Sequence, residues 1–244
     1  MENVNKKKEI SKTQVFNVII LDRSGSMESI RQAAVEGFNE TLAGIKKAQK
    51  KFADTQKHFV SLATFCSCGT ENVYDKTPVD EVQPLKASDY EPCCRTPLYD
   101  AMGITIKAIY KHVKDIEDAV VVVTVITDGM ENASKEYSRH DIKGLVERLR
   151  NEGWTFTYMG ANQNSIEIAA SISIRNASNF EFSNRGIVNT MTKDSATRMN
   201  FFARLSKMKE NESADGCNDT MTAEIRRRIY TGMADDAFDE ENGK

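Results

Sequence analysis

The sequence predicts an α/β domain with a doubly wound, mostly parallel central sheet, helices on both faces and one short antiparallel edge strand. Two observations lead to this prediction. Short, β-branched apolar runs at 15–21 and 120–127 are typical of buried strands. Strand patterns alternate with helical patterns along most of the chain, which indicates parallel strands joined by helices that cover both faces of the sheet.

The first half of the chain supplies one strand, one long helix and a hairpin. After the strand at 15–21, a helix is expected from Glu28 to about Lys51, because apolar residues recur there at spacings of three and four. Strands are expected at 59–65 and 72–74, close enough in sequence to pair as a hairpin, so the shorter one is the antiparallel edge. The segment 76–95 is rich in proline and acidic residues and is expected to be irregular.

The second half continues the alternation and ends in a polar segment. The expected elements are a helix from Pro97 to about Lys114, a strand at 119–127, a helix at about 139–151, a strand at 155–159, a helix at 162–171, a strand at 178–182 and a helix from 184 to about 208. Residues 1–12 are expected to form a flexible arm before a domain that spans 13–208. Residues 209–244 are expected to form a polar, acidic tail with at most a short helical turn at 222–229.

Composition is that of a globular protein and argues against two classes of partner. The 244 residues are 40% hydrophobic, which is enough for one α/β domain with a substantial core. The formal net charge of −3 does not favour attraction to nucleic acid or membranes, and no run approaches the roughly 18 apolar residues of a membrane span. The lysine-rich N-terminus lacks the apolar segment of a secretory signal, so we expect a cytoplasmic protein.

Oxygen-bearing side chains directly follow the first strand. Asp22, Ser24 and Ser26 alternate along a tight turn whose backbone is relaxed by Gly25. Oxygen ligands in this pattern suit Mg²⁺, which prefers near-octahedral oxygen geometry and keeps several waters. The alternative is a solvated turn that caps the following helix, because serine and aspartate are favoured at helix N-caps.

Two distant residues are expected at the same edge of the sheet. Asp128 follows the apolar run 120–127, and open α/β sheets bind ligands at the carboxyl ends of their parallel strands. Thr96 precedes Pro97, a residue suited to the first helical position, so its hydroxyl is expected at a helix start on the same face.

These five residues and the phrases around them resemble a known family. The residues are, in chain order, Asp22, Ser24, Ser26, Thr96 and Asp128. Together with the phrases FNVIILD, TPLYDA and ITDG that carry three of them, they are similar to the metal-ion-dependent adhesion site of von Willebrand factor type A (VWA) domains over roughly 13–208. The resemblance implies a Rossmann-like fold, a bound Mg²⁺ or Mn²⁺, and a partner protein that supplies an Asp or Glu carboxylate to the metal.

One residue departs from the family pattern, and two other functions stay open. Arg95 stands where a glycine often precedes the threonine, and a cation there is expected to weaken metal affinity or to select the partner.

A Mg²⁺-dependent hydrolase or phosphoryl-transfer enzyme on a related fold would need a nucleophile or base beside the metal. Asp22 could serve, but the chain has no glycine-rich phosphate loop. A scaffold with a degenerate, unliganded site is the other alternative.

The chain has five cysteines, and four of them are expected near this edge. Cys66 and Cys68 follow the strand at 59–65, and Cys93 and Cys94 come just before the next helix. Zinc sites usually space paired cysteines by two to four residues, so this set is a poor match. We expect reduced, unliganded thiols that are dispensable for folding; zinc or a redox pair is the alternative.

Overall fold

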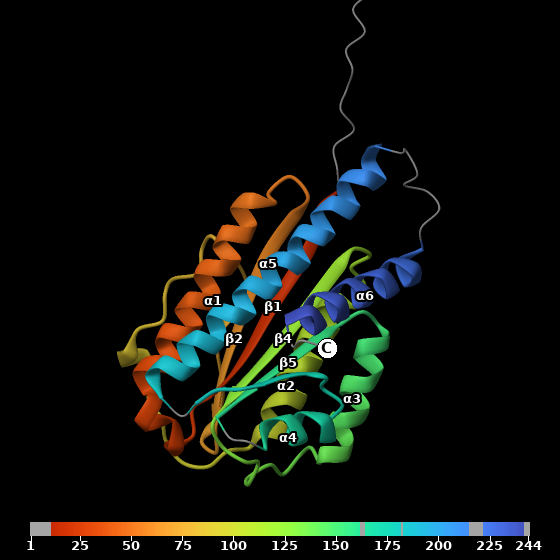
Figure 1. The fold of residues 1–244 in the computed structure, drawn as a ribbon. Helices are drawn as coiled ribbons and strands as arrows, with labels where there is room; N and C mark the ends of the chain where they lie inside the picture. The colour runs from red at the N-terminus through yellow and green to blue at the C-terminus, as the bar shows by residue number, and fades with distance from the viewer. Residues whose placement is uncertain (1–10, 162–163, 182, 215–221, 242–244) are drawn as a thin grey trace, which may run out of the picture.

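A six-stranded sheet forms the centre of the molecule (Figure 1). The computed structural model describes residues 11–161, 164–181, 183–214 and 222–241. The strand order is β3-β2-β1-β4-β5-β6. The strands are β1 (Thr13–Asp22), β2 (Gln56–Cys66), β3 (Gly69–Pro78), β4 (Ala119–Thr127), β5 (Thr155–Gly160) and β6 (Asn176–Asn179). Only β3 is antiparallel to its neighbour among these strands, which confirms the predicted fold class.

Helices cover both faces of this sheet. They are α1 (Arg31–Lys51), α2 (Leu98–Val113), α3 (Arg139–Asn151), α4 (Ser165–Ser171), α5 (Asn184–Ala214) and α6 (Ala223–Glu241), with 3-10 turns η1 (Gly25–Ile30) and η2 (Ala87–Asp89). The helices α1 and α5 lie side by side on one face, and α6 packs against α5 (Figure 1). The helices α2, α3 and α4 bury their apolar residues against the other face.

The alternation of side chains along β1 divides the core into two layers. Phe16 and Ile20 join the apolar cluster beneath α2 and α3, whereas Ile19 and Leu21 join the cluster beneath α1 and α5. Successive residues of a strand point to opposite faces of the sheet, and helices cover both faces here, so both sets are buried. A central strand covered on both faces therefore needs the near-continuous apolar run that the sequence displays.

The C-terminal part of the chain differs from the expected tail. The helix α5 continues past residue 208 to Ala214, and residues 223–241 form α6 rather than a short turn. Tyr230 and Phe238 of α6 are buried, and Tyr230 packs in one apolar cluster with residues of the sheet and α5. The Tyr230 hydroxyl donates a hydrogen bond of 2.8 Å to Asp118 Oδ1. This helix is thus part of the folded domain.

Several boundaries also differ from the sequence prediction. The strand β3 is ten residues long and takes up the start of the segment expected to be irregular. The strand β6 ends at Asn179, and α4 begins at Ser165; Phe182 and residues 162–163 of the corresponding predictions lie outside the described residues. Residues 1–10 of the expected arm also lie outside them. Among the described residues, no helix combines the length and apolar character needed to cross a bilayer.

Candidate metal centre

The carboxyl end of β1 carries a buried carboxylate. Asp22 is the last residue of β1 and is 0% exposed. Its Oδ1 accepts a hydrogen bond of 2.7 Å from the backbone N–H of Ser24, and its Oδ2 accepts one of 2.5 Å from the Thr127 hydroxyl. The Tyr90 hydroxyl donates to the Asp22 carbonyl oxygen. These contacts fix the orientation of the side chain and of the turn that follows.

The two serines connect this carboxylate with the end of β4. Ser24 Oγ lies 3.2 Å from Ser26 Oγ, and Ser26 Oγ donates a hydrogen bond of 2.7 Å to Asp128 Oδ1. Ser24 occupies the N-cap position of η1, yet its side chain makes no capping hydrogen bond. The serine hydroxyls therefore face one another and the second carboxylate, which is not the arrangement expected for a simple capping turn.

Gly129 marks the point at which the segments meet. A β-carbon placed on this glycine would lie 3.1 Å from Thr96 Oγ1, 3.6 Å from Ser26 Oγ and 3.8 Å from Asp22 Oδ2. Thr96 is 3% exposed and Asp128 is 7% exposed. The structure thus brings all five of the sequence-predicted residues to one edge of the sheet, around a space that a side chain on residue 129 would fill.

Burial disfavours the charged form of both carboxylates. Removal from water raises the pKa of Asp22 to about 6, against hydrogen bonds from Thr127 and Ser24 that lower it, and the nearby charge of Asp128 raises it slightly more. Burial also raises the pKa of Asp128 above its usual range. A bound cation would stabilise the charged forms of these two neighbouring buried carboxylates.

Residues of the β4–α3 loop hold the start of α2 in place. Asn132 Oδ1 accepts a hydrogen bond of 3.0 Å from the Thr96 backbone N–H. Glu131 Oε2 accepts one of 3.0 Å from the Tyr99 N–H. In return, the Asp100 carboxylate accepts hydrogen bonds from three backbone N–H groups of the loop, those of Lys135, Glu136 and Tyr137.

The helix α2 begins one residue later than predicted. Its first residue is Leu98 and its N-cap is Pro97, so the Thr96 side chain is not needed as a cap.

Two residues that support this site are not predicted by the sequence patterns. The apolar run 120–127 predicts Thr127 only as a strand residue, although its hydroxyl contacts the Asp22 carboxylate. Its position directly before Asp128 could have identified Thr127. The neighbouring parallel strands β1 and β4 end side by side, so the last residue of β4 lies close to Asp22 at the end of β1. No periodic pattern marks Asn132, which lies in an irregular loop.

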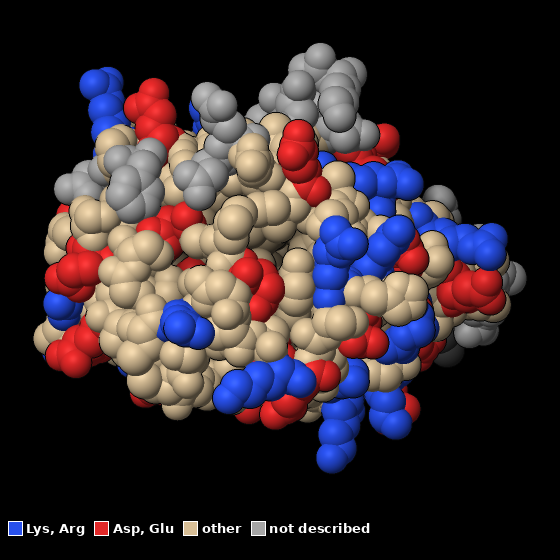
Figure 2. Space-filling view, turned by 90° about the horizontal axis from the view of Figure 1, so that it is seen from below, with Lys and Arg blue, Asp and Glu red and all other residues tan. Residues whose placement is uncertain are grey.

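The surface around the candidate site combines charged and uncharged areas. Figure 2 looks onto the edge of the sheet where β1 and β4 end, and acidic side chains lie there within a broad uncharged area. An open groove of about 640 Å³ adjoins the site, and its lining includes Arg95, Asp100, Asn132 and Lys135. The lining carries two basic residues, Arg95 and Lys135, and two acidic ones, Asp100 and Glu136, so its formal charge is balanced.

Comparisons with known proteins give the fold a counterpart among solved structures. No protein-family model matches the sequence, and no curated protein matches it. The pilus adhesin SpaC from Lactobacillus rhamnosus GG aligns at 14% identity with a TM-score of 0.57, over 81% of this chain and 32% of that chain. The SpRpn10 VWA domain aligns at 11% identity with a TM-score of 0.54, over 73% of this chain and 94% of that domain.

The two matches differ in how much of the other protein they cover. This chain spans about a third of the adhesin's length but nearly the whole of the SpRpn10 domain. At identities this low, the likeness concerns the arrangement of helices and strands alone. By strand order, sheet type and this likeness, the chain has the fold of a VWA domain.

Proposed function

We propose that this chain is a divalent-metal-dependent protein-binding domain that captures an acidic residue of a partner protein through Mg²⁺ or Mn²⁺. The observation that carries the proposal is the convergence of two carboxylates and three hydroxyls around Gly129. All of these donors are oxygens, which are the ligands that Mg²⁺ and Mn²⁺ prefer. A β-carbon on residue 129 would lie within 4 Å of three of these oxygens, so the glycine leaves the position between them to a small cation.

The division of roles follows from charge. Ser24, Ser26 and either Thr96 or Asp128 would touch the metal directly, and the remaining side chains would act through water. Neutral hydroxyls in direct contact leave much of the positive charge of a divalent ion uncompensated, so the ion attracts an external carboxylate. A metal bound here would supply the electrophile, while this chain's residues hold and orient it.

The groove beside the site supports a protein partner. It is lined by basic, acidic and polar side chains, and Arg95 is one of its two basic residues. Arg95 is exposed and directly precedes Thr96, so it is placed to contact an acidic segment of a partner. One protein of this fold, SpaC, is a pilus adhesin, which is consistent with a binding function.

Calorimetry with Mg²⁺ and with Mn²⁺ tests the metal site directly. We expect one site in the wild type, no binding in Asp22→Ala, and normal binding in Asp115→Ala, a matched control that removes an exposed carboxylate after α2. Equal heats for wild type and Asp22→Ala would favour the unliganded scaffold. Turnover of phosphoester substrates by the wild type, lost in Asp22→Ala, would favour the hydrolase alternative.

A pull-down with and without chelator tests the role of the metal in partner capture. Thr96→Ala should reduce partner recovery more than it reduces metal affinity, because the partner carboxylate depends on the ion's uncompensated charge. If the partner completes the metal's coordination, it must raise Mg²⁺ affinity by the same factor that Mg²⁺ raises partner affinity. Identical recovery of the partner in Mg²⁺ and in chelator would rule out metal-mediated binding.

A further inference from the structure

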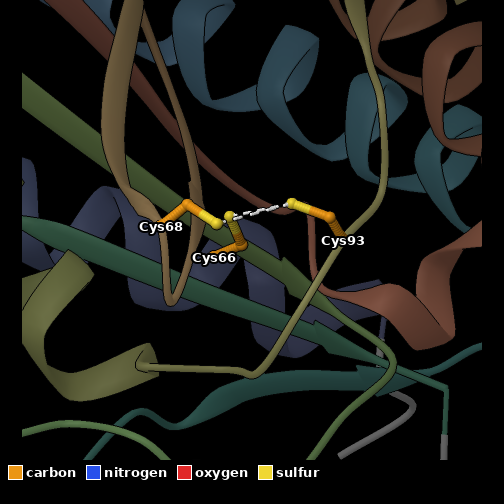
Figure 3. A group of neighbouring side chains, drawn as sticks. All are labelled: Cys66, Cys68 and Cys93. Carbon is orange, nitrogen blue, oxygen red and sulfur yellow. Dashed lines mark hydrogen bonds between the residues drawn. The ribbon is translucent and has the colours of Figure 1, made fainter.

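Four cysteine side chains from two distant segments converge beside the candidate metal centre. The sulfur–sulfur distances are 3.3 Å for Cys66–Cys93, 3.3 Å for Cys68–Cys94 and 4.0 Å for Cys68–Cys93. Figure 3 shows Cys66, at the end of β2, and Cys68, in the turn between β2 and β3, with their thiols directed toward Cys93, from the segment before α2. The sulfurs thus form one connected group rather than two separate pairs.

Backbone contacts hold the two segments together independently of the thiols. The Ser67 N–H donates to the Arg95 carbonyl at 3.0 Å, and the Arg95 N–H donates to Ser67 Oγ at 3.1 Å. The Cys93 N–H donates to the Arg23 carbonyl at 2.9 Å. The β2–β3 turn and the 93–95 segment are therefore fixed against each other, and the cysteines of both face the same small volume.

The backbone of Cys94 explains how two adjacent cysteines reach the same cluster. Successive side chains of an extended chain point in opposite directions. Cys94 instead has a φ of 63°, in the left-handed region that residues other than glycine seldom adopt. This conformation turns the chain between Cys93 and Cys94, so that each sulfur contacts Cys68. This turn allows the adjacent Cys93 and Cys94, whose spacing in the sequence is a poor match to zinc sites, to join one cluster.

The sulfurs of Cys66, Cys68 and Cys93 all lie within 4.8 Å of one another, and Cys94 joins this group through Cys68, so the ligand spacing of a tetrahedral thiolate site is reached by three sulfurs and requires the fourth to move closer. A zinc–sulfur distance of about 2.3 Å in a tetrahedral site separates the sulfurs by about 3.8 Å. The three distances of 3.3, 3.3 and 4.0 Å lie on both sides of that value. A disulfide requires a sulfur–sulfur distance of about 2.05 Å. The Arg23 guanidinium, with Nη2 4.0 Å from Cys66 Sγ, adds positive charge that favours thiolates at this position.

We infer that Cys66, Cys68, Cys93 and Cys94 bind one zinc ion in a closed, four-thiolate structural site. Four protein ligands leave no open position on the ion, so the site would stabilise structure rather than carry out catalysis. Binding would displace the protons of the thiols that ligate the ion. The zinc would fasten the segment that leads into Thr96 to the β2–β3 turn, and it would thereby help to position the hydroxyl of the neighbouring metal centre.

Metal analysis of the full chain, purified without chelator, tests this inference. We expect one zinc per chain in the wild type and less than a tenth of that in Cys68→Ser/Cys94→Ser, which alters two exposed side chains and should leave the fold intact. Replacement of zinc by Co²⁺ in the wild type should give the thiolate charge-transfer and visible d–d bands of a tetrahedral sulfur site. This spectrum does not depend on the folding of any variant.

Two control variants test whether the fifth cysteine or the neighbouring oxygen centre contributes to zinc binding. Cys217→Ser removes the fifth cysteine and should retain full zinc, and Asp22→Ala should also retain it even if magnesium binding is lost. Loss of zinc in either control would overturn the assigned ligand set. Absence of zinc from the wild type would overturn the inference, as would Cys66–Cys93 and Cys68–Cys94 disulfides found by mass spectrometry of the alkylated, unreduced protein.

Discussion

Asn132 contacts Thr96 through both its side chain and its backbone. Its Oδ1 accepts a hydrogen bond of 3.0 Å from the Thr96 N–H, and its own N–H donates one of 3.1 Å to the Thr96 carbonyl oxygen. Thr96 is thus paired with the loop that follows Asp128, and the two halves of the candidate metal centre cannot shift independently. A residue that does not itself face the metal position therefore sets where one of the proposed ligands lies.

Removal of the Asn132 side chain should weaken metal binding without unfolding the domain. In Asn132→Ala the Thr96 N–H loses its side-chain acceptor, and partners that orient ligands typically contribute about tenfold or more to metal affinity. We expect Mg²⁺ affinity to fall by about tenfold in calorimetry, with little change in thermal midpoint because Asn132 is exposed. Asn132→Asp keeps the acceptor and should retain most of the affinity. Unchanged binding in Asn132→Ala would show that this contact does not position Thr96.

A methyl group on residue 129 should block the centre. In Gly129→Ala the new β-carbon would lie 3.1 Å from Thr96 Oγ1, within the space that the proposed ligands surround. Crowding of this kind typically costs about 1–3 kcal/mol, so Mg²⁺ affinity should fall by about 5- to 150-fold. The matched control is Gly144→Ala in α3, where an added β-carbon meets nothing within 4 Å. That change should leave Mg²⁺ binding intact and stabilise the helix by about 0.5–1 kcal/mol. Normal Mg²⁺ binding by Gly129→Ala would place the ion elsewhere.

The sheet could be predicted from the sequence because its central strands are buried on both faces. The Val120–Val123 run and the run at 15–21 leave little choice of structure, since only a fully covered strand needs so continuous an apolar surface. The positions of Asp22 and Asp128 follow from the ends of those strands. Burial thus explains why the five residues lie at the expected edge of the sheet, while their role as metal ligands stays a prediction.

Other features depend on contacts that no local pattern encodes. In α6 the buried residues Tyr230, Ala234, Ala237 and Phe238 do follow helical spacing, but two of the four are alanines, and the acidic neighbours are typical of a solvated tail. The thiol cluster depends on a left-handed backbone at Cys94, which no sequence pattern predicts. The pairing of Asn132 with Thr96 joins two loops 36 residues apart.

Deletion of residues 222–244 should strongly destabilise the domain. The deletion exposes the surface that Tyr230 and Phe238 cover, and loss of a buried aromatic side chain typically costs about 3–5 kcal/mol. We expect a fall of at least about 3 kcal/mol in the free energy of unfolding, measured by urea denaturation. An unchanged midpoint would mean that α6 contributes nothing to the core.

A single-atom change in α6 tests the same contact more finely. Tyr230→Phe removes the hydroxyl that donates to Asp118 Oδ1, while Thr13 and Lys209 still contact the other carboxylate oxygen. The loss should be about 1 kcal/mol in the free energy of unfolding. The control Arg228→Ala alters an exposed residue of the same helix and should change stability by less than about 0.5 kcal/mol. An equal effect of the two substitutions would show that the hydrogen bond does not stabilise the docked helix.

His58 should make the domain less stable as the pH falls below neutrality. Burial lowers the pKa of His58 from its usual 6.5 to about 3. Its Nε2 lies 3.0 Å from Gln56 Oε1, its Nδ1 lies 3.5 Å from Asn17 Nδ2, and its ring packs edge-on against Phe202. Protonation of Nδ1 would direct an N–H toward the Asn17 amide nitrogen, so the folded state favours the neutral ring.

The sign of the effect follows from where the proton binds. Below about pH 6.5 the unfolded chain takes up a proton on His58 that the folded chain does not, so the free energy of unfolding falls by up to about 1.4 kcal/mol per pH unit. Between neutral pH and about pH 4.5, His58 should account for a loss of about 2.5 kcal/mol. The measurement is the difference in pH dependence between wild type and His58→Gln in urea denaturation. His140→Gln, which alters an exposed histidine, should follow the wild type. Parallel curves for wild type and His58→Gln would show that the buried ring is not the titrating group.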